Sequence, residues 1–149
     1  LHNFPAAAID AAGDIVCHGT PPGEYAWPVD IVPLTDSDEA PLLALTAQRS
    51  MATSGRDQRH WRQRDGTTAH HIIDPRTFAP AQSDVVRASV IAPTLVQADV
   101  TARMLVIMGV EAGITWLAHH PECAAMMQTT DARSVMSPQW HEYVWSDPV

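Results

Sequence analysis

The 149-residue sequence contains no lysine, and all nine of its basic residues are arginine. Seventeen acidic residues outnumber them, so the formal net charge is −8. A chain with this balance lacks the positive surface that binds nucleic acid or an anionic membrane, and we expect neither partner. The longest apolar run, MLVIMGV at 104–110, is far shorter than the roughly 20 residues of a transmembrane helix.

Cysteine is also scarce. Cys17 and Cys123 are too few for a disulfide framework, and buried free thiols are common, so they do not indicate a redox compartment. The stretch HHPEC at 119–123 gathers residue types that ligate zinc. Adjacent helical residues point about 100° apart, however, and the sequence offers no fourth ligand, so we expect no zinc site there.

Hydrophobic residues make up 46% of the sequence and charged residues 17%, which is typical of a folded domain with a buried core. We expect residues 1–149 to form a single domain. The first part alternates with the period of a strand: Trp27, Val29 and Ile31 would share one face. Further strands are expected on both sides of a turn at Gly13–Asp14, at 42–55 and at 85–93, with an acidic loop at 34–41.

The pair Asp65-Gly66 lies between two strand-like runs and predicts a hairpin with a type I′ turn. Its second strand would continue through residues 71–74 and end at Pro75, which cannot donate to a ladder. In such a strand His71 and Ile73 face one way, and the residues that alternate with them face the other.

From Thr94 to Met108 the apolar residues recur every three or four positions, which predicts a helix. Thr94 is a typical N-cap, and Gly109 a typical stop. A second short helix is expected at 111–120, followed by one or two strands around a turn at Asp131. The fold class is therefore α+β, with a mostly antiparallel sheet and two helices packed on it.

The stretch HHIIDPRTFAP at 70–80 places an imidazole, a carboxylate and a hydroxyl at a predicted strand end. One interpretation is a site where His71 and exposed backbone meet a polar ligand. The other is purely local, because Asp74 and Thr77 are suited to hydrogen bonds within a turn. The spacing alone does not choose between them.

Asp99 is a second candidate, placed in the first turn of the predicted helix. There it would stabilise the helix through the macrodipole and through an i, i+4 ion pair with Arg103. Alternatively, its carboxylate oxygens suit a hard cation such as Mg²⁺.

Five of the nine arginines fall within sixteen residues. Such a cluster suits bidentate contacts with a phosphate, but it also suits a solvated strand face whose arginines pair with Asp57 and Asp65. The five are Arg49, Arg56, Arg59, Arg62 and Arg64.

Six stretches occur in a characteristic order: AAGDI (11–15), MATSG (51–55), HIIDPRTFAP (71–80), ASVIAPTLVQAD (88–99), ADVTARMLVIMG (98–109) and VMSPQW (135–140). In order and spacing they resemble the ApbE-type FAD:protein FMN transferases, or flavin transferases. The resemblance covers essentially the whole chain but only the C-terminal half of a typical member. It implies the C-terminal portion of an ApbE-like, T-fold-like domain.

Enzymes of this type move the FMN half of FAD to a serine or threonine hydroxyl of a target flavoprotein, release AMP and use Mg²⁺. The resemblance thus implies FAD as substrate, Mg²⁺ as metal and a target flavoprotein as partner. It assigns metal binding to Asp99 and proton transfer or phosphate contact to His71. The cofactor-binding positions that it implies are Ser54, Gly55, Ile73, Asp74 and Thr77.

The sequence also departs from the family pattern. Arg103 stands where members place a threonine, and Ala102 stands where some add an aspartate. A guanidinium repels a metal ion and can pair with Asp99 in its place. Thr101 is a poor substitute, because two positions along a helix it points about 200° away. Phe78 replaces the glycine of the box, and the DLGGIAKGY-like segment that supplies further FAD and metal contacts is not in this sequence.

Three functions therefore stay open: an FMN transferase, an FAD-binding module without transfer activity, and a relative that hydrolyses FAD to FMN and AMP. The resemblance favours the first, and Arg103 favours the second. We also expect self-association if the absent half of the pattern normally covers apolar surface. The compartment stays open, because many members are periplasmic or membrane-anchored and no targeting segment is recognisable here.

Overall fold

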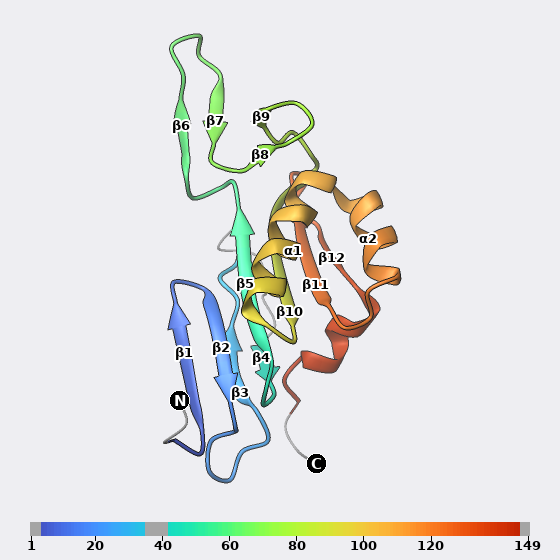
Figure 1. Cartoon of the computed structure of the whole chain (residues 1–149). Helices are drawn as coiled ribbons and strands as arrows, with labels where there is room; N and C mark the ends of the chain where they lie inside the picture. The colour runs from blue at the N-terminus through green and yellow to red at the C-terminus, as the bar shows by residue number, and fades with distance from the viewer. Residues whose placement is uncertain (1–3, 35–41, 147–149) are drawn as a thin grey trace.

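The computed structural model describes residues 4–34 and 42–146 (Figure 1). Its centre is a six-stranded antiparallel sheet in the order β1-β2-β5-β10-β11-β12. The strands are β1 (Ala7–Ala11), β2 (Asp14–His18), β5 (Ser50–Gly55), β10 (Val85–Ala92), β11 (Ala124–Thr129) and β12 (Ser134–Met136). The predicted α+β class is confirmed.

Two helices, α1 (Leu95–Met108) and α2 (Val110–Ala118), cover one face of this sheet (Figure 1). The predicted caps of α1 are confirmed: Thr94 Oγ1 accepts a hydrogen bond from the Gln97 N–H at 3.2 Å, and Gly109 adopts a φ of 82°. One expectation for this helix is wrong. Asp99 is its fifth residue and lies beyond the first turn, where the macrodipole no longer favours a carboxylate.

Side chains along the central strands point alternately to the two faces of the sheet, and a hydrophobic core lies on each face. On β10, Val90 packs under the helices, whereas Ile91 packs into the core of the opposite face. That second core is closed by β3 (Trp27–Asp30), β4 (Leu42–Leu45) and a 3₁₀ helix, η1 (Pro138–Tyr143), which the sequence pattern did not predict. The face expected for β3 is confirmed, since Val29 lies in this core. Most of the expected acidic loop, 35–41, lies outside the described residues.

A hairpin of β6 (His60–Arg62) and β7 (Thr68–His70) projects from the body of the molecule (Figure 1). The predicted hairpin is confirmed, but the predicted type I′ turn is wrong. Only Gly66 has a positive φ, of 87°, and its N–H donates to the Gln63 carbonyl oxygen at 3.1 Å. A type I′ turn would need a positive φ at Asp65 as well.

The predicted continuous strand through residues 71–74 is also wrong. β7 ends at His70, and a separate two-residue strand, β8 (Ile73–Asp74), pairs with β9 (Ala79–Pro80). The ladder breaks because the N–H of Ile72 bonds to a ring nitrogen of His70 at 3.3 Å instead of to a neighbouring strand. The expected facing is confirmed: His71 and Ile73 are exposed, while their alternating neighbours are buried.

The end of the described chain follows the expectation of strands around Asp131. β11 and β12 pair in antiparallel register on either side of it. Within the two described segments, no helix is both long enough and apolar enough to cross a membrane.

Candidate functional site

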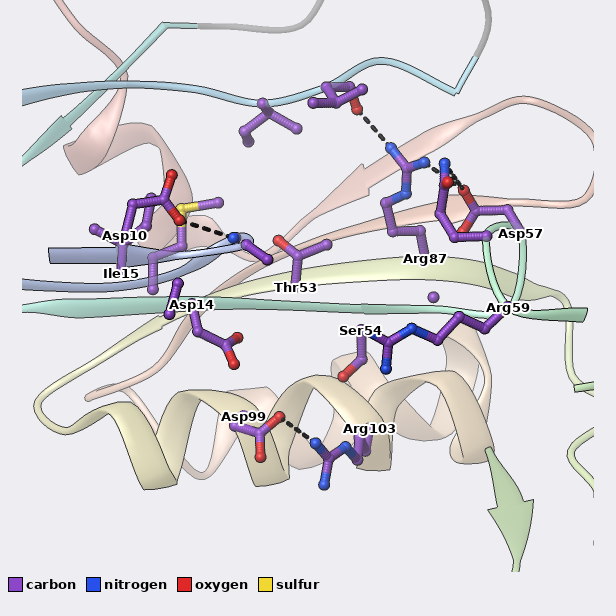
Figure 2. A pocket seen from close by; sticks show the side chains of 18 of the residues that line it. Asp10, Asp14, Ile15, Thr53, Ser54, Asp57, Arg59, Arg87, Asp99 and Arg103 are labelled. Atoms are coloured by element: carbon purple, nitrogen blue, oxygen red, sulfur yellow. Dashed lines mark hydrogen bonds and ion pairs between the residues drawn. The ribbon is translucent and has the colours of Figure 1, made fainter. Parts of the chain in front are cut away.

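A cavity of about 810 Å³ lies where the central sheet splits (Figure 2). β2 pairs with β5 only at Ile15–Met51 and Val16–Ser50, so the rest of β5 has no partner strand on that side among the described residues. The β1–β2 turn, the loop after β5 and helix α1 form the walls. A volume of this size falls in the roughly 300–1,000 Å³ range of small-molecule sites, and unpaired strand backbone offers hydrogen-bonding groups to a ligand.

The β1–β2 turn that forms one wall depends on two positive backbone angles. Ala12 has a φ of 59° and Gly13 a φ of 97°. The carboxylate of Asp10 accepts a hydrogen bond from the Gly13 N–H at 2.8 Å and so secures this turn. The turn in turn presents Asp14, the first residue of β2, to the cavity.

Four of the sequence-predicted residues line this cavity, and they come from separate elements: Ser54 and Gly55 from β5, His71 from the end of the projecting hairpin, and Asp99 from α1. Ile73, Asp74 and Thr77 do not line it. They lie in β8 and the turn that follows, and their contact with a ligand stays a prediction.

Asp74 organises its own turn. Its carboxylate accepts hydrogen bonds from the Arg76 backbone N–H at 2.9 Å and from the Arg76 guanidinium at 2.8 Å. These bonds with Arg76 hold the pKa of Asp74 below its ordinary value. The carbonyl oxygen of Asp74 accepts a hydrogen bond from the N–H of Phe78, which closes the turn with a φ of 57° and is itself 86% exposed. The family's glycine at this position suits such a backbone angle without strain.

Asp99 does not stand alone in the cavity. Its Oδ1 lies 2.8 Å from Arg103 Nη2, so the i, i+4 ion pair expected from the sequence is present. Asp14 faces the same pair: burial raises the pKa of Asp14, the charge of Asp99 raises it further, and that of Arg103 opposes both. Asp14 was not among the predicted site residues, although it belongs to the AAGDI stretch that marked the resemblance.

These residues do not fit a resident Mg²⁺ ion. Mg²⁺ requires oxygen ligands in near-octahedral geometry, commonly one or two carboxylates together with substrate phosphates. Asp99 already contacts a guanidinium, which would repel the ion. Across residues 4–34 and 42–146, no group of three histidine, cysteine, aspartate or glutamate residues is placed to hold a metal.

The wall opposite α1 contains a second ion pair. The guanidinium of Arg87, which is buried, contacts the carboxylate of Asp57. Burial works against the ionised form of Asp57, but the hydrogen bond and charge of Arg87 outweigh it, and the pKa of Asp57 lies below its ordinary value. Gly55 makes this pair possible, because a Cβ at that position would overlap Asp57 Oδ1 and press on Arg87 Cγ.

Of the five clustered arginines, only Arg59 lines the cavity, and Figure 2 shows its side chain directed toward Ser54. Arg56 donates instead to two backbone carbonyl oxygens beyond β9. The proposed pairing of this cluster with Asp57 and Asp65 is wrong, because Asp57 pairs with an arginine of β10 and Asp65 bonds to a threonine. The sequence identified the cluster but not the member that reaches the cavity.

His71 lies at the rim of the cavity and is exposed. Its Nδ1 lies 3.4 Å from the carbonyl oxygen of Arg59, which favours a proton on Nδ1 and leaves Nε2 as the acceptor. The site therefore combines an imidazole that can take up a proton with two ion pairs and one further guanidinium.

The described residues thus form a two-core α+β fold with a charged pocket at a split in its sheet. The sequence model of the ApbE family matches residues 2–127, and the chain belongs to this family.

Individual relatives agree. The chain is 31% identical over 141 residues to the FAD:protein FMN transferase of Treponema pallidum, a match that covers 89% of this chain and 39% of that protein. It is 30% identical over 125 residues to the FAD:protein FMN transferase of Escherichia coli K12, covering 81% and 35%. The chain thus spans less than half the length of these relatives.

Solved structures show the same fold. The crystal structure of the ApbE protein from Thermotoga maritima superposes with a TM-score of 0.79 at 23% identity and covers 95% of this chain and 45% of that one. The apo flavinyl transferase ApbE of Pseudomonas stutzeri gives a TM-score of 0.76 at 18% identity, with coverage of 96% and 45%.

Proposed function

We propose that this chain acts as one domain of an FAD:protein FMN transferase and binds FAD in the cavity beside β5. The acceptor would be a serine or threonine hydroxyl of a target flavoprotein. The observation that carries the proposal is the convergence of Ser54 and Gly55, His71 and Asp99 on one cavity from three separate segments of the sequence. Their family positions and the names of the relatives point to the same substrate.

In this proposal the acceptor oxygen forms a bond to the flavin-side phosphorus of FAD. The bond from that phosphorus to the bridging oxygen breaks, and AMP leaves. The hydroxyl proton passes to Nε2 of His71, which the contact between Nδ1 and the Arg59 carbonyl leaves free. Such a transfer depends mainly on positioning and on positive charge near the phosphates.

A second function, FAD binding without transfer, is favoured by one observation. Asp99 is paired with Arg103 within the cavity, and the family's Mg²⁺-dependent chemistry would need that carboxylate to be released. Under this alternative the chain is a flavin-binding relative without transfer activity. An acceptor flavoprotein and self-association of the chain are further parts of this proposal.

The test is to mix the purified chain with FAD and a threonine-containing acceptor peptide. Binding is followed by flavin fluorescence, AMP by chromatography and peptide-bound FMN by mass. The proposal predicts FAD binding and transfer that His71→Gln abolishes while binding persists. His141→Gln is the matched control, because His141 is exposed on η1 and does not line the cavity. Binding without AMP release would favour the second function, and no FAD binding would contradict both.

A further inference from the structure

Two guanidinium groups enter the cavity from different elements. Arg103 projects from α1, and Arg59 comes from the loop between β5 and β6. Figure 2 shows Ser54, on β5, beside the end of the Arg59 side chain, whereas the guanidinium of Arg103 is directed toward Asp99. Ser54 lines the cavity but is buried, so little of this residue is accessible to bulk water.

The charges of the two arginines are not equally satisfied. Arg103 contacts Asp99 through one nitrogen, Nη2, and its side chain remains 57% exposed. Among the residues that the structure describes, no carboxylate forms a salt bridge with Arg59. A guanidinium carries five N–H donors in a planar fork, so both arginines keep donors available for an anion.

The acidic residues of the cavity are placed differently. Figure 2 shows Asp10 and Asp14 toward the β1–β2 turn, on the other side of the view from Arg59. Asp57 is neutralised by Arg87. Asp30 and Asp99 also line the cavity, and Asp99 is paired with Arg103, so Arg59 is the guanidinium that lies away from Asp10 and Asp14.

We propose that Arg59, Arg103 and the Ser54 hydroxyl form a diphosphate-binding subsite that works without a divalent cation. Two guanidiniums on separate elements suit a diphosphate better than a single phosphate, because each contacts its own phosphoryl group bidentately. Arg103 supplies the positive charge that a metal ion would otherwise bring and neutralises the carboxylate of Asp99. The inference that this subsite binds the diphosphate of FAD rests on the proposed function. The inference that it binds a diphosphate at all depends only on the two arginines.

The experiment is a calorimetric titration of inorganic pyrophosphate into the purified chain in the presence of EDTA. Arg59→Gln and Arg103→Gln each remove one guanidinium from an exposed side chain. Arg62→Gln is the matched control, because Arg62 is equally exposed on β6 but does not line the cavity. Thermal unfolding of each variant verifies that it is folded, and FAD is titrated in parallel.

The subsite predicts pyrophosphate binding in EDTA that weakens about tenfold in each cavity variant, as expected for hydrogen bonds to a charged group, and is unchanged in Arg62→Gln. Raised salt should weaken it further. Absence of binding in EDTA, or equal binding by all variants, overturns the inference. FAD binding that survives removal of both arginines overturns it while leaving the proposed function intact. Pyrophosphate binding without FAD binding supports the subsite and contradicts the proposed function.

Discussion

Arg103 lies one helical turn beyond Asp99 on α1, and its Nη2 is 2.8 Å from Asp99 Oδ1 inside the cavity. The carboxylate that the family pattern assigns to a metal is therefore paired with a permanent cation of the same chain. Asp14 faces this pair from β2. The arrangement places a permanent positive charge beside the carboxylate that a metal ion would otherwise contact.

Millimolar Mg²⁺ is expected to leave the melting temperature unchanged, and EDTA is expected to have no effect. The reason is that the ion would have to displace Arg103 from Asp99. A ligand present at 100 times its Kd adds about 2.7 kcal/mol of stability, so specific binding would be easily visible by calorimetry. A rise of several degrees in the wild-type chain would contradict the expectation. Arg103→Thr, which frees Asp99 beside Asp14, is the variant in which Mg²⁺ should begin to stabilise.

Asp99→Asn is expected to lower the free energy of unfolding by no more than about 0.5 kcal/mol, because a partly exposed i, i+4 ion pair contributes little. Loss of the repulsion with Asp14 offsets part of that cost. Asp131→Asn is the comparison, since it removes the more exposed ion pair with Arg133. Urea denaturation measures both. A loss above about 2 kcal/mol, or complete loss of FAD binding in Asp99→Asn, would show that the carboxylate does more than pair with Arg103.

Stability is expected to fall as the pH drops below about 6.5, and His70 is the cause. Its ring is buried, with Nε2 donating to the Ala81 carbonyl oxygen at 3.0 Å and Nδ1 accepting from the Ile72 N–H. Burial lowers the pKa of His70 despite the bond to Ala81. The unfolded chain therefore takes up the proton first, and stability is lost as the pH falls through the folded-state pKa.

The measurement is the urea midpoint of the chain as a function of pH between 7.5 and roughly 5, a window set by the histidine pKa. His70→Gln should flatten the dependence, whereas His71→Gln, at an exposed ring, should preserve it. An unchanged slope in His70→Gln would assign the pH dependence to other groups.

Gly55→Ala is expected to destabilise the protein by about 1–3 kcal/mol, the usual cost of an added atom in a packed site. The new Cβ would overlap the Asp57 carboxylate and disturb its pairing with Arg87. A double-mutant cycle with Asp57→Ala tests the cause, because the cost of Gly55→Ala should shrink once the carboxylate is gone. Additive effects of the two substitutions would exclude this explanation.

The elements with strong local signals were predictable. The three-to-four residue spacing and the flanking Thr94 and Gly109 define α1 almost to the residue. The alternation at Trp27, Val29 and Ile31 gives the buried face of β3 correctly. In these cases the information is local: a cap bonds within its own turn, and a strand face follows from period two.

The break at Ile72 and the composition of the cavity were not predictable in the same way. Ile72 leaves the ladder because of the buried ring of His70 next to it and the return of the chain at Ala81. Asp14 and Arg59 line one cavity at the place where β2 no longer pairs with β5 beyond Met51. The pairing register of two strands that lie far apart in the sequence cannot be predicted from the residues next to Asp14 or Arg59.

We expect this cavity to bind FAD, with Arg103 in the place of the metal. The most direct measurement is a calorimetric titration of FAD into the purified chain, once with EDTA and once with millimolar Mg²⁺. Saturable binding with the same Kd is expected under both conditions. Binding that appears or tightens only with Mg²⁺ would contradict it, and so would the absence of any binding.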